Sequence, residues 1–319
     1  MRKWLMFACV FTACAAAAQP APPLDPVVPQ WAEIETVHAG ARPGPALWHI
    51  TKGNSEVWIL GMIGTMPKGV TWNPQPLAEV MQGSRAMIVG QSADIDLLDI
   101  SWFLVTHCCS FFRLDDGKLD DFLPEPTKVK LAAMRENVGG DAKLYQGDAP
   151  LGAANRLGGA YAKKYDLQGE NPMAAVRKLA SDNKLAVQPI FHFDPMDIVK
   201  EAFKLTPQQQ RPCLDANMED VERRVTHFRP MGEAWAVGDI IGIKENFTES
   251  RIQQCLAAAV HAFGTNQQNV VPGFVAAIDA ALDKPGKTFA VVDMGPLLRK
   301  GGVLEQLEGQ HLTIEGPAE

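Results

Sequence analysis

Two apolar runs with the character of buried strands lie near opposite ends of this chain. The first runs from Glu56 to Ile63 and the second from Thr288 to Val292. Short apolar runs bounded by turn residues are typical of strands inside a sheet. A long stretch of helical character separates the two runs, so we expect both ends of the chain to contribute strands to one sheet.

Each end of the chain favours a βαβ unit, because strand, helix and strand follow one another in that order. The predicted fold is α/β (α+β), a mixed sheet from N- and C-terminal βαβ units with a large helical middle region. The elements expected at the two ends are strands at 45–50, 56–63 and 86–89 with a helix at 74–82, then a strand at 288–292, a helix to residue 307 and a strand at 311–314.

The middle of the chain has apolar residues at helical spacing. The charged residues of 219–224 are expected to face solvent. Helices are predicted at 127–137, 151–165, 172–183, 197–205, 207–226, 232–237, 251–261 and 275–282.

Composition and charge restrict the class of partner. The chain has 319 residues, of which 46% are hydrophobic and 21% are charged, and its net charge is −7. No run of Lys or Arg is present, so a nucleic-acid partner is not expected. No segment after the N-terminal region reaches the ~20 apolar residues that a membrane-spanning helix needs.

The N-terminus has the pattern of an export signal. A short basic segment, an apolar stretch and a run of alanines precede Gln19. This order is typical of a cleaved secretory signal, so we predict a signal peptide at 1–18, a Pro/Ala-rich leader at 19–44 and one domain at 45–319. The expected location is periplasmic. Cys14 lies in a loose lipoprotein box, and its acylation is the alternative.

Four cysteines remain after removal of the signal peptide. An oxidising compartment favours disulfides. Cys108 and Cys109 are adjacent and are poorly placed to bond each other. The preferred pairing is Cys213 with Cys255, each within a helical segment, and the alternative is two buried thiols. No CxxC spacing indicates a metal site.

Ligands of α/β proteins gather where strands end at their carboxyl side. Three strand ends matter in this sequence: Gly61 to Thr65, Val89 to Gln91, and Val292 to Pro296. The first of these strand ends carries Gly64 at a position where enzymes often place a ligating or catalytic side chain.

The chain resembles the TraB/GumN family, which is related to the Tiki metalloproteases and to the ChaN/erythromycin-esterase type of fold. The resemblance rests on PALW, VWILG, the closing segment KPGKTFAVVDMGPLLRKGGVLEQL and the export signal, and it runs from about Pro45 to the end. It implies two Gly-x-x-His motifs and a glutamate that hold a divalent metal for hydrolysis.

This sequence departs from the pattern that the resemblance implies. The first motif falls on Gly61 to Gly64, so its histidine position holds Gly64. The glutamate position falls near Gly90. The second motif ends in Gly295 and Pro296, so its histidine position holds proline. Glycine and proline offer a metal only backbone carbonyls, so no cofactor is expected and Gly64 is interpreted as a vacated ligand position. The alternative is that Gly64 simply makes a tight strand exit.

Other residues are candidates for a rebuilt site. His192, Asp194 and Asp293 could perform acid–base chemistry or bind a metal. Asp194 precedes Pro195, and this order favours a helix N-cap instead. Arg299 to Gly302 is more typical of a turn into a helix than of a phosphate loop. Five further histidines have no carboxylate or cysteine at metal-ligand spacing: His49, His107, His227, His261 and His311.

Three functional hypotheses follow from these observations. The first is an exported pseudoenzyme that binds a protein or small-molecule ligand in the old cleft. The second is an active hydrolase whose site is rebuilt around Asp293. The third is an envelope scaffold that is anchored to the membrane through a lipid on Cys14.

Overall fold

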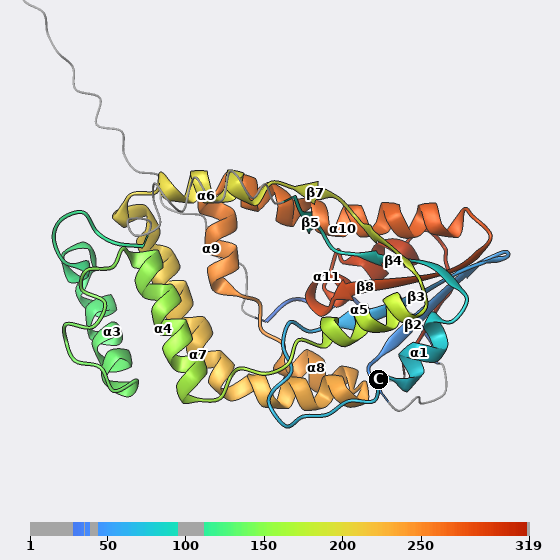
Figure 1. Cartoon of the computed structure of the whole chain (residues 1–319), viewed down its shortest axis with the longest axis horizontal. Helices are drawn as coiled ribbons and strands as arrows, with labels where there is room; N and C mark the ends of the chain where they lie inside the picture. The colour runs from blue at the N-terminus through green and yellow to red at the C-terminus, as the bar shows by residue number, and fades with distance from the viewer. Residues whose placement is uncertain (1–27, 35, 39–43, 95–111, 318–319) are drawn as a thin grey trace, which may run out of the picture.

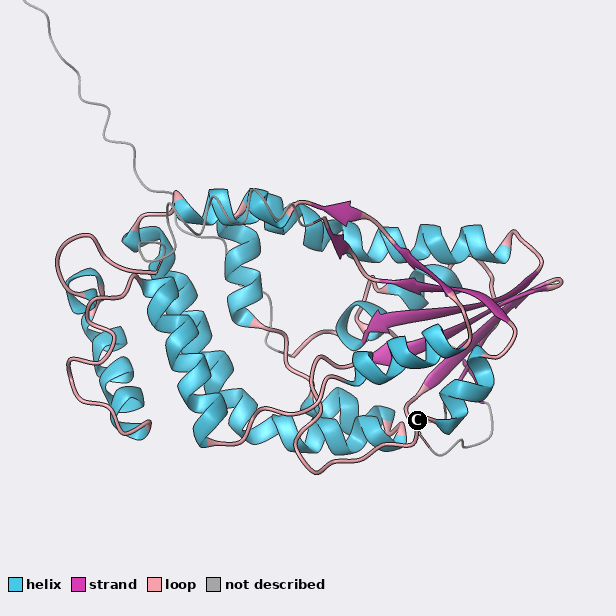
Figure 2. Cartoon of the chain, viewed as in Figure 1, coloured by secondary structure: helices cyan, strands magenta, loops and turns pink. Residues whose placement is uncertain are grey.

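The computed structural model describes residues 28–34, 36–38, 44–94 and 112–317. The signal peptide, Cys14, His107, Cys108 and Cys109 lie outside these residues. Figures 1 and 2 show a mixed α/β molecule with its strands gathered on one side and a group of helices on the other. The α/β fold class is therefore confirmed. None of the helices in the described part of the chain combines the length and apolar character that a membrane span requires.

One seven-stranded sheet unites the two ends of the chain, as predicted. Its order is β1-β9-β2-β3-β8-β4-β6. β3, β8, β4 and β6 are parallel, whereas β2 runs antiparallel to both β3 and β9. A second pair, β5·β7, follows β4 and β6 along the chain. The strands are β1 (Thr36–His38), β2 (Leu47–Lys52), β3 (Ser55–Met62), β4 (Ser84–Val89), β5 (Ser92–Ala93), β6 (Ala186–Pro189), β7 (His192–Phe193), β8 (Gly286–Asp293) and β9 (Ile314–Gly316).

The helices of the middle region agree only in part with those predicted from the sequence. α10 packs across β3, β8 and β4, and Figure 1 draws it above these strands with α5 below them. The helical elements are α1 (Gln75–Met81), η1 (Leu119–Phe122), α3 (Glu125–Asn137), α4 (Pro150–Lys164), α5 (Pro172–Asp182), α6 (Pro195–Phe203), α7 (Pro207–Val237), α8 (Ile240–Asn246), α9 (Arg251–Ala259), α10 (His261–Leu282), α11 (Met294–Leu298) and α12 (Val303–Glu308).

The helices predicted at 207–226 and 232–237 are one helix, α7. Pro230 lies inside it and does not end it. The helix continues because its last turns bury Ala234 and Trp235 against the sheet. With 31 residues, α7 is about 46 Å long. Thr206 caps its start by accepting a hydrogen bond from the Gln209 amide.

Three other boundaries differ from the prediction. The helix expected at 251–261 ends at Ala259, because Val260 is extended with φ −121°. α10 then begins at His261, well before the expected residue 275, although Pro272 lies inside it. The last strand begins at Ile314 and not at His311, whose φ of 63° is incompatible with a strand.

The chain builds two main apolar cores. The first surrounds the sheet and includes Leu60 and Phe289, both fully buried. The second lies among α3, α4 and α7, and includes Leu157 and Leu214. Because α7 contributes Leu214 to one core and Trp235 to the other, it ties the two cores together.

Part of the expected leader packs on the domain. β1 pairs in parallel with β9, and the buried Ala32 donates its amide to the Leu298 carbonyl at 3.0 Å. Trp31 forms an isolated bridge with Arg299. These contacts place residues 36–38 on the same sheet, and Trp31 and Ala32 beside the end of α11.

Candidate functional site

Three strand exits lie at one edge of the sheet. β8 pairs in parallel with β3 on one side and β4 on the other. The register sets Met62 opposite Asp293 and Ile88 opposite Ala290. Parallel neighbours end at the same edge, which is where ligands of α/β sheets bind. The segments after β3, β8 and β4 therefore face one region, with Asp293 in the middle.

Gly64 and Gly90 have room for side chains. Neither has a backbone φ in the left-handed region. Within the described part of the chain, a Cβ atom built on either residue would have no heavy atom within 4 Å outside its chain neighbours. Backbone conformation and packing therefore do not require glycine at these two positions. The alternative interpretation, that Gly64 simply makes a tight strand exit, stays open, because an exposed glycine at a strand end needs no conformational reason.

The glycines at the other two motif positions are held by packing. A Cβ at Gly61 would lie 2.5 Å from Met294 Cε and 3.0 Å from Trp48 Cζ3. A Cβ at Gly295 would lie 2.8 Å from Phe247 Cζ. Both glycines are buried, so a larger residue would have to displace packed neighbours. Gly61 and Gly295 shape the edge, whereas Gly64 and Gly90 leave it open.

The loop after β3 is fixed by contacts from two other parts of the chain. The Met66 amide donates to the Glu170 carbonyl at 2.8 Å, and Arg229 Nη2 donates to the Lys68 carbonyl at 3.1 Å. The buried Trp235 donates its Nε1 proton to the Gly61 carbonyl at 2.7 Å. This edge of the sheet is therefore formed before any ligand binds.

Asp293 is the one ionisable residue on the strand-exit motifs. It occupies the N-cap position of α11, but its side chain makes no capping hydrogen bond. Its side chain is solvent-exposed, and within the described part of the chain it has no hydrogen bond or ion pair. Desolvation by the surrounding protein raises the pKa of Asp293 above its ordinary value.

The other two candidates are engaged elsewhere. Asp194 caps α6 by accepting a hydrogen bond from the Met196 amide at 2.8 Å, in line with the N-cap reading. His192 Nδ1 lies 2.8 Å from Asp94 Oδ1, and both side chains are exposed. No hydrogen bond or ion pair among the described residues joins either candidate to Asp293. The three candidates therefore do not form one hydrogen-bonded acid–base set.

Sequence patterns missed the carboxylate partners of His49. His49 Nε2 lies 2.8 Å from Glu56 Oε2, and Nδ1 lies 3.1 Å from Glu315 Oε2. Its ring stacks on Trp58, with centroids 4.0 Å apart. The hairpin register sets His49 opposite Trp58, which could have been inferred, but Glu315 arrives through the unexpected pairing of β2 with β9.

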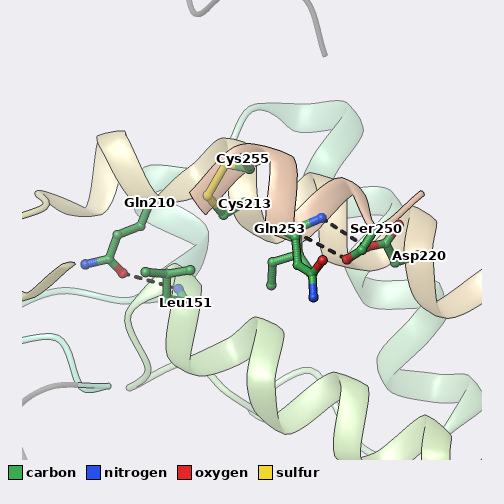
Figure 3. The surroundings of a disulfide bond; sticks show 8 residues. Leu151, Gln210, Cys213, Asp220, Ser250, Gln253 and Cys255 are labelled. Carbon is green, nitrogen blue, oxygen red and sulfur yellow. Dashed lines mark hydrogen bonds between the residues drawn. A yellow bond between two sulfur atoms is a disulfide. The ribbon is translucent and has the colours of Figure 1, made fainter. Parts of the chain in front are cut away.

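A disulfide joins α7 to α9, as Figure 3 shows. It links Cys213 to Cys255, so the preferred pairing is confirmed. Also on α7, Asp220 is buried. The charged residues of 219–224 were expected to face solvent, so this expectation is wrong for Asp220. Its carboxylate accepts hydrogen bonds from Ser250 Oγ and from the Arg251 and Ile252 amides, at 2.9–3.0 Å. Asp220 therefore caps the start of α9 from a neighbouring helix.

The fold defines a class: an α/β protein with a sheet of mixed direction, whose parallel strands β3, β8 and β4 end at one edge. The chain belongs to the TraB/PrgY/gumN family, whose model matches residues 46–316. Searches of curated proteins and of solved structures return no match to this chain.

The described residues do not fit the divalent metal that the family resemblance implies. Gly64 and Gly90 have no side-chain donor, and Pro296 lies in α11 with an apolar ring. Across residues 28–94 and 112–317, apart from the few gaps stated above, no group of three or more His, Cys, Asp and Glu side chains could hold a metal ion. Asp293 alone is too few ligands for a hard cation.

Proposed function

We propose that this chain is an exported, catalytically inactive member of its family that binds a ligand or partner at the carboxyl edge of the sheet. The observation that carries the proposal is the freedom at Gly64 and Gly90. The fold has space for ligating side chains at both positions and no conformational need for glycine. The loss of the donors is therefore a property of this sequence and not a consequence of a distorted scaffold.

Retention of the binding region supports a function other than hydrolysis. The loop after β3 is still held by Glu170, Arg229 and Trp235, although it carries no ligating residue. A fixed edge with open space suits the binding of a ligand.

The Cys213–Cys255 disulfide supports the exported location. Disulfides persist in oxidising compartments and are rare in the cytosol. Mass spectrometry of the mature protein tests this part of the proposal. Cleavage after residue 18 is expected, whereas an acylated Cys14 would favour the lipid-anchored scaffold, and an intact Met1 in exported fractions would contradict both.

The metal-binding test compares the wild-type protein with the triple variant G64H/G90E/P296H. Calorimetric titration with Mn²⁺, Co²⁺ and Zn²⁺ should give no stoichiometric binding to the wild type. The triple variant should gain one site, because histidine and carboxylate ligands are restored at the three positions. The matched control is G64A/G90A, which fills the same positions without donors and should not bind metal.

One result would overturn the proposal. If the wild-type protein binds one metal equivalent and hydrolyses a peptide or ester only when that metal is supplied, the chain is an active hydrolase. Loss of that activity in Asp293→Asn would then place the rebuilt site at the end of β8.

A further inference from the structure

A histidine on β2 is held between two carboxylates from the neighbouring strands. His49 Nε2 lies 2.8 Å from Oε2 of Glu56 on β3, and His49 Nδ1 lies 3.1 Å from Oε2 of Glu315 on β9. The indole of Trp58 stacks on the imidazole with the ring centroids 4.0 Å apart, and only 14% of the His49 side chain is exposed. These four residues form the His49 cluster, which joins three neighbouring strands of the sheet.

The charged groups that face the His49 imidazole are these two carboxylates. β2 lies between β3 and β9 in the sheet, and each of these strands contributes one of them, Glu56 and Glu315. The next charged residue along β2 is Lys52, which is paired with Asp283 Oδ1 at 2.7 Å. Within the described part of the chain, His49 has no other ion pair. A change in the charge of His49 therefore acts on Glu56 and Glu315 first.

Both carboxylate contacts require two protons on the His49 ring. An imidazolium donates a hydrogen bond from each nitrogen, whereas a neutral imidazole has one N–H and one lone pair. Loss of the proton therefore leaves a lone pair facing one of the two carboxylates. The contact with Glu315 is the one that breaks, because it is the longer of the two and because Glu56 also accepts a hydrogen bond from Trp58 Nε1 at 3.2 Å. The Glu315 side chain is 46% exposed, so it can turn into solvent.

We propose that the His49 cluster is a pH-sensitive switch: protonated His49 holds β9 and β1 on the sheet, and neutral His49 loosens both strands. β9 has three residues, and two of them, Ile314 and Glu315, pair with β2. β1 lies outside β9 at the edge of the sheet and depends on β9 for its pairing. Because these backbone contacts are few, the side-chain contact of Glu315 with His49 is a large part of what holds the two strands.

The N-terminal residues that precede β1 connect this switch to α11. Trp31 packs edge-on against Phe247, with the ring centroids 5.5 Å apart. Phe247 in turn lies against Gly295, because a Cβ atom on that glycine would be 2.8 Å from Phe247 Cζ. Loosening of β1 therefore reaches, through these contacts, the helix that follows β8 at the carboxyl edge of the sheet.

Hydrogen exchange of the full chain, followed by mass spectrometry, tests the switch. The wild type is compared at about pH 5.5 and about pH 8.5, which lie on either side of the range where histidine changes charge, after correction for the intrinsic effect of pH on amide exchange. Protection of residues 36–38 and 314–316 should be about fivefold lower at the higher pH, because one charge-assisted hydrogen bond at a part-exposed site is lost. Protection of β8, which has no pairing with β2, should not change.

Matched variants assign the effect to the His49 cluster. Glu315→Gln keeps the shape of the side chain, and its amide can accept from an N–H or donate to a lone pair, so protection should differ less than about twofold between the two pH values. His227→Gln is the control, because His227 Nδ1 faces the uncharged Asn246 Oδ1 at 3.2 Å, and it should keep the fivefold change of the wild type. The ¹⁵N resonances of the His49 ring should report two protons at about pH 5.5 and one at about pH 8.5. Far-UV circular dichroism checks that each variant folds.

Three results would overturn the switch. They are equal protection of residues 36–38 and 314–316 at the two pH values in the wild type, the same pH dependence in Glu315→Gln as in the wild type, and a loss of protection in β8 as large as that in β9. None of them affects the metal titration of the wild type, so the proposed function is tested separately.

Discussion

Asp293 makes stability depend on pH in a direction opposite to most carboxylates. Desolvation by the surrounding protein raises its pKa in the folded state above the unfolded value of 3.8, although the side chain itself reaches solvent. The folded state therefore binds more protons than the unfolded state between 3.8 and the raised pKa, and stability falls as pH rises through that window. Asp293→Asn removes the free-energy cost of holding a partly desolvated negative charge in the folded state. At pH 7 its melting temperature should rise by roughly 1–2 °C, because the side chain is exposed and its shift is screened.

The pH series separates this effect from a general change in packing. Thermal unfolding of the wild type and Asp293→Asn should converge below about pH 3.8, where the aspartate is protonated in both states. A melting-temperature gain of the same size at every pH would show that the carboxylate charge is not its origin.

Single-residue roles could be predicted where the signal is local. Asp194 before Pro195 indicates a cap, and the structure contains that cap. The two partners of His49 could not be predicted together, because Glu315 joins it through a strand pairing between distant parts of the chain. That Gly64 has room for a side chain could not be predicted either, because the sequence gives neither the backbone φ of a glycine nor its neighbours in space.

At the scale of elements, α9 depends on a carboxylate from α7. Asp220→Ala removes the acceptor of the Arg251 and Ile252 amides, and it should lower the free energy of unfolding by about 3 kcal/mol. Chemical denaturation measures the loss. Glu219→Ala is the control, because its ion pairs are at the surface and its removal should cost less than about 1 kcal/mol. Equal losses in the two variants would contradict the capping role.

The errors in predicted elements have a common physical cause. The gap predicted between residues 226 and 232 contains Pro230, yet burial of Trp235 and its hydrogen bond to the Gly61 carbonyl favour continuation of the helix. Pro272 similarly lies inside α10, and the part of α10 before residue 275 was not predicted as this helix. Local propensity is a weak guide where tertiary packing favours the other state. The central strands were predictable because their apolar runs are continuous.

At the scale of the whole molecule, α7 should make the two cores unfold together. Leu214→Ala opens a cavity in the helical core and should lower the free energy of unfolding by about 3 kcal/mol. Because α7 also anchors the sheet through Trp235, amide exchange should accelerate in β3 and β8 as well. Hydrogen exchange measures this. Val129→Ala, at an exposed position on α3, is the control. Unchanged protection of the sheet would mean that the cores are independent.

The position of β8 between β3 and β4 has a consequence for biosynthesis. The chain leaves the ribosome with β3 and β4 early, but the strand that joins them is residues 286–293 of 319. Two strand edges must therefore stay unpaired until β8 has been made, and such edges invite aggregation. The partly made sheet depends on the arrival of β8 to cover edges that would otherwise pair with another chain.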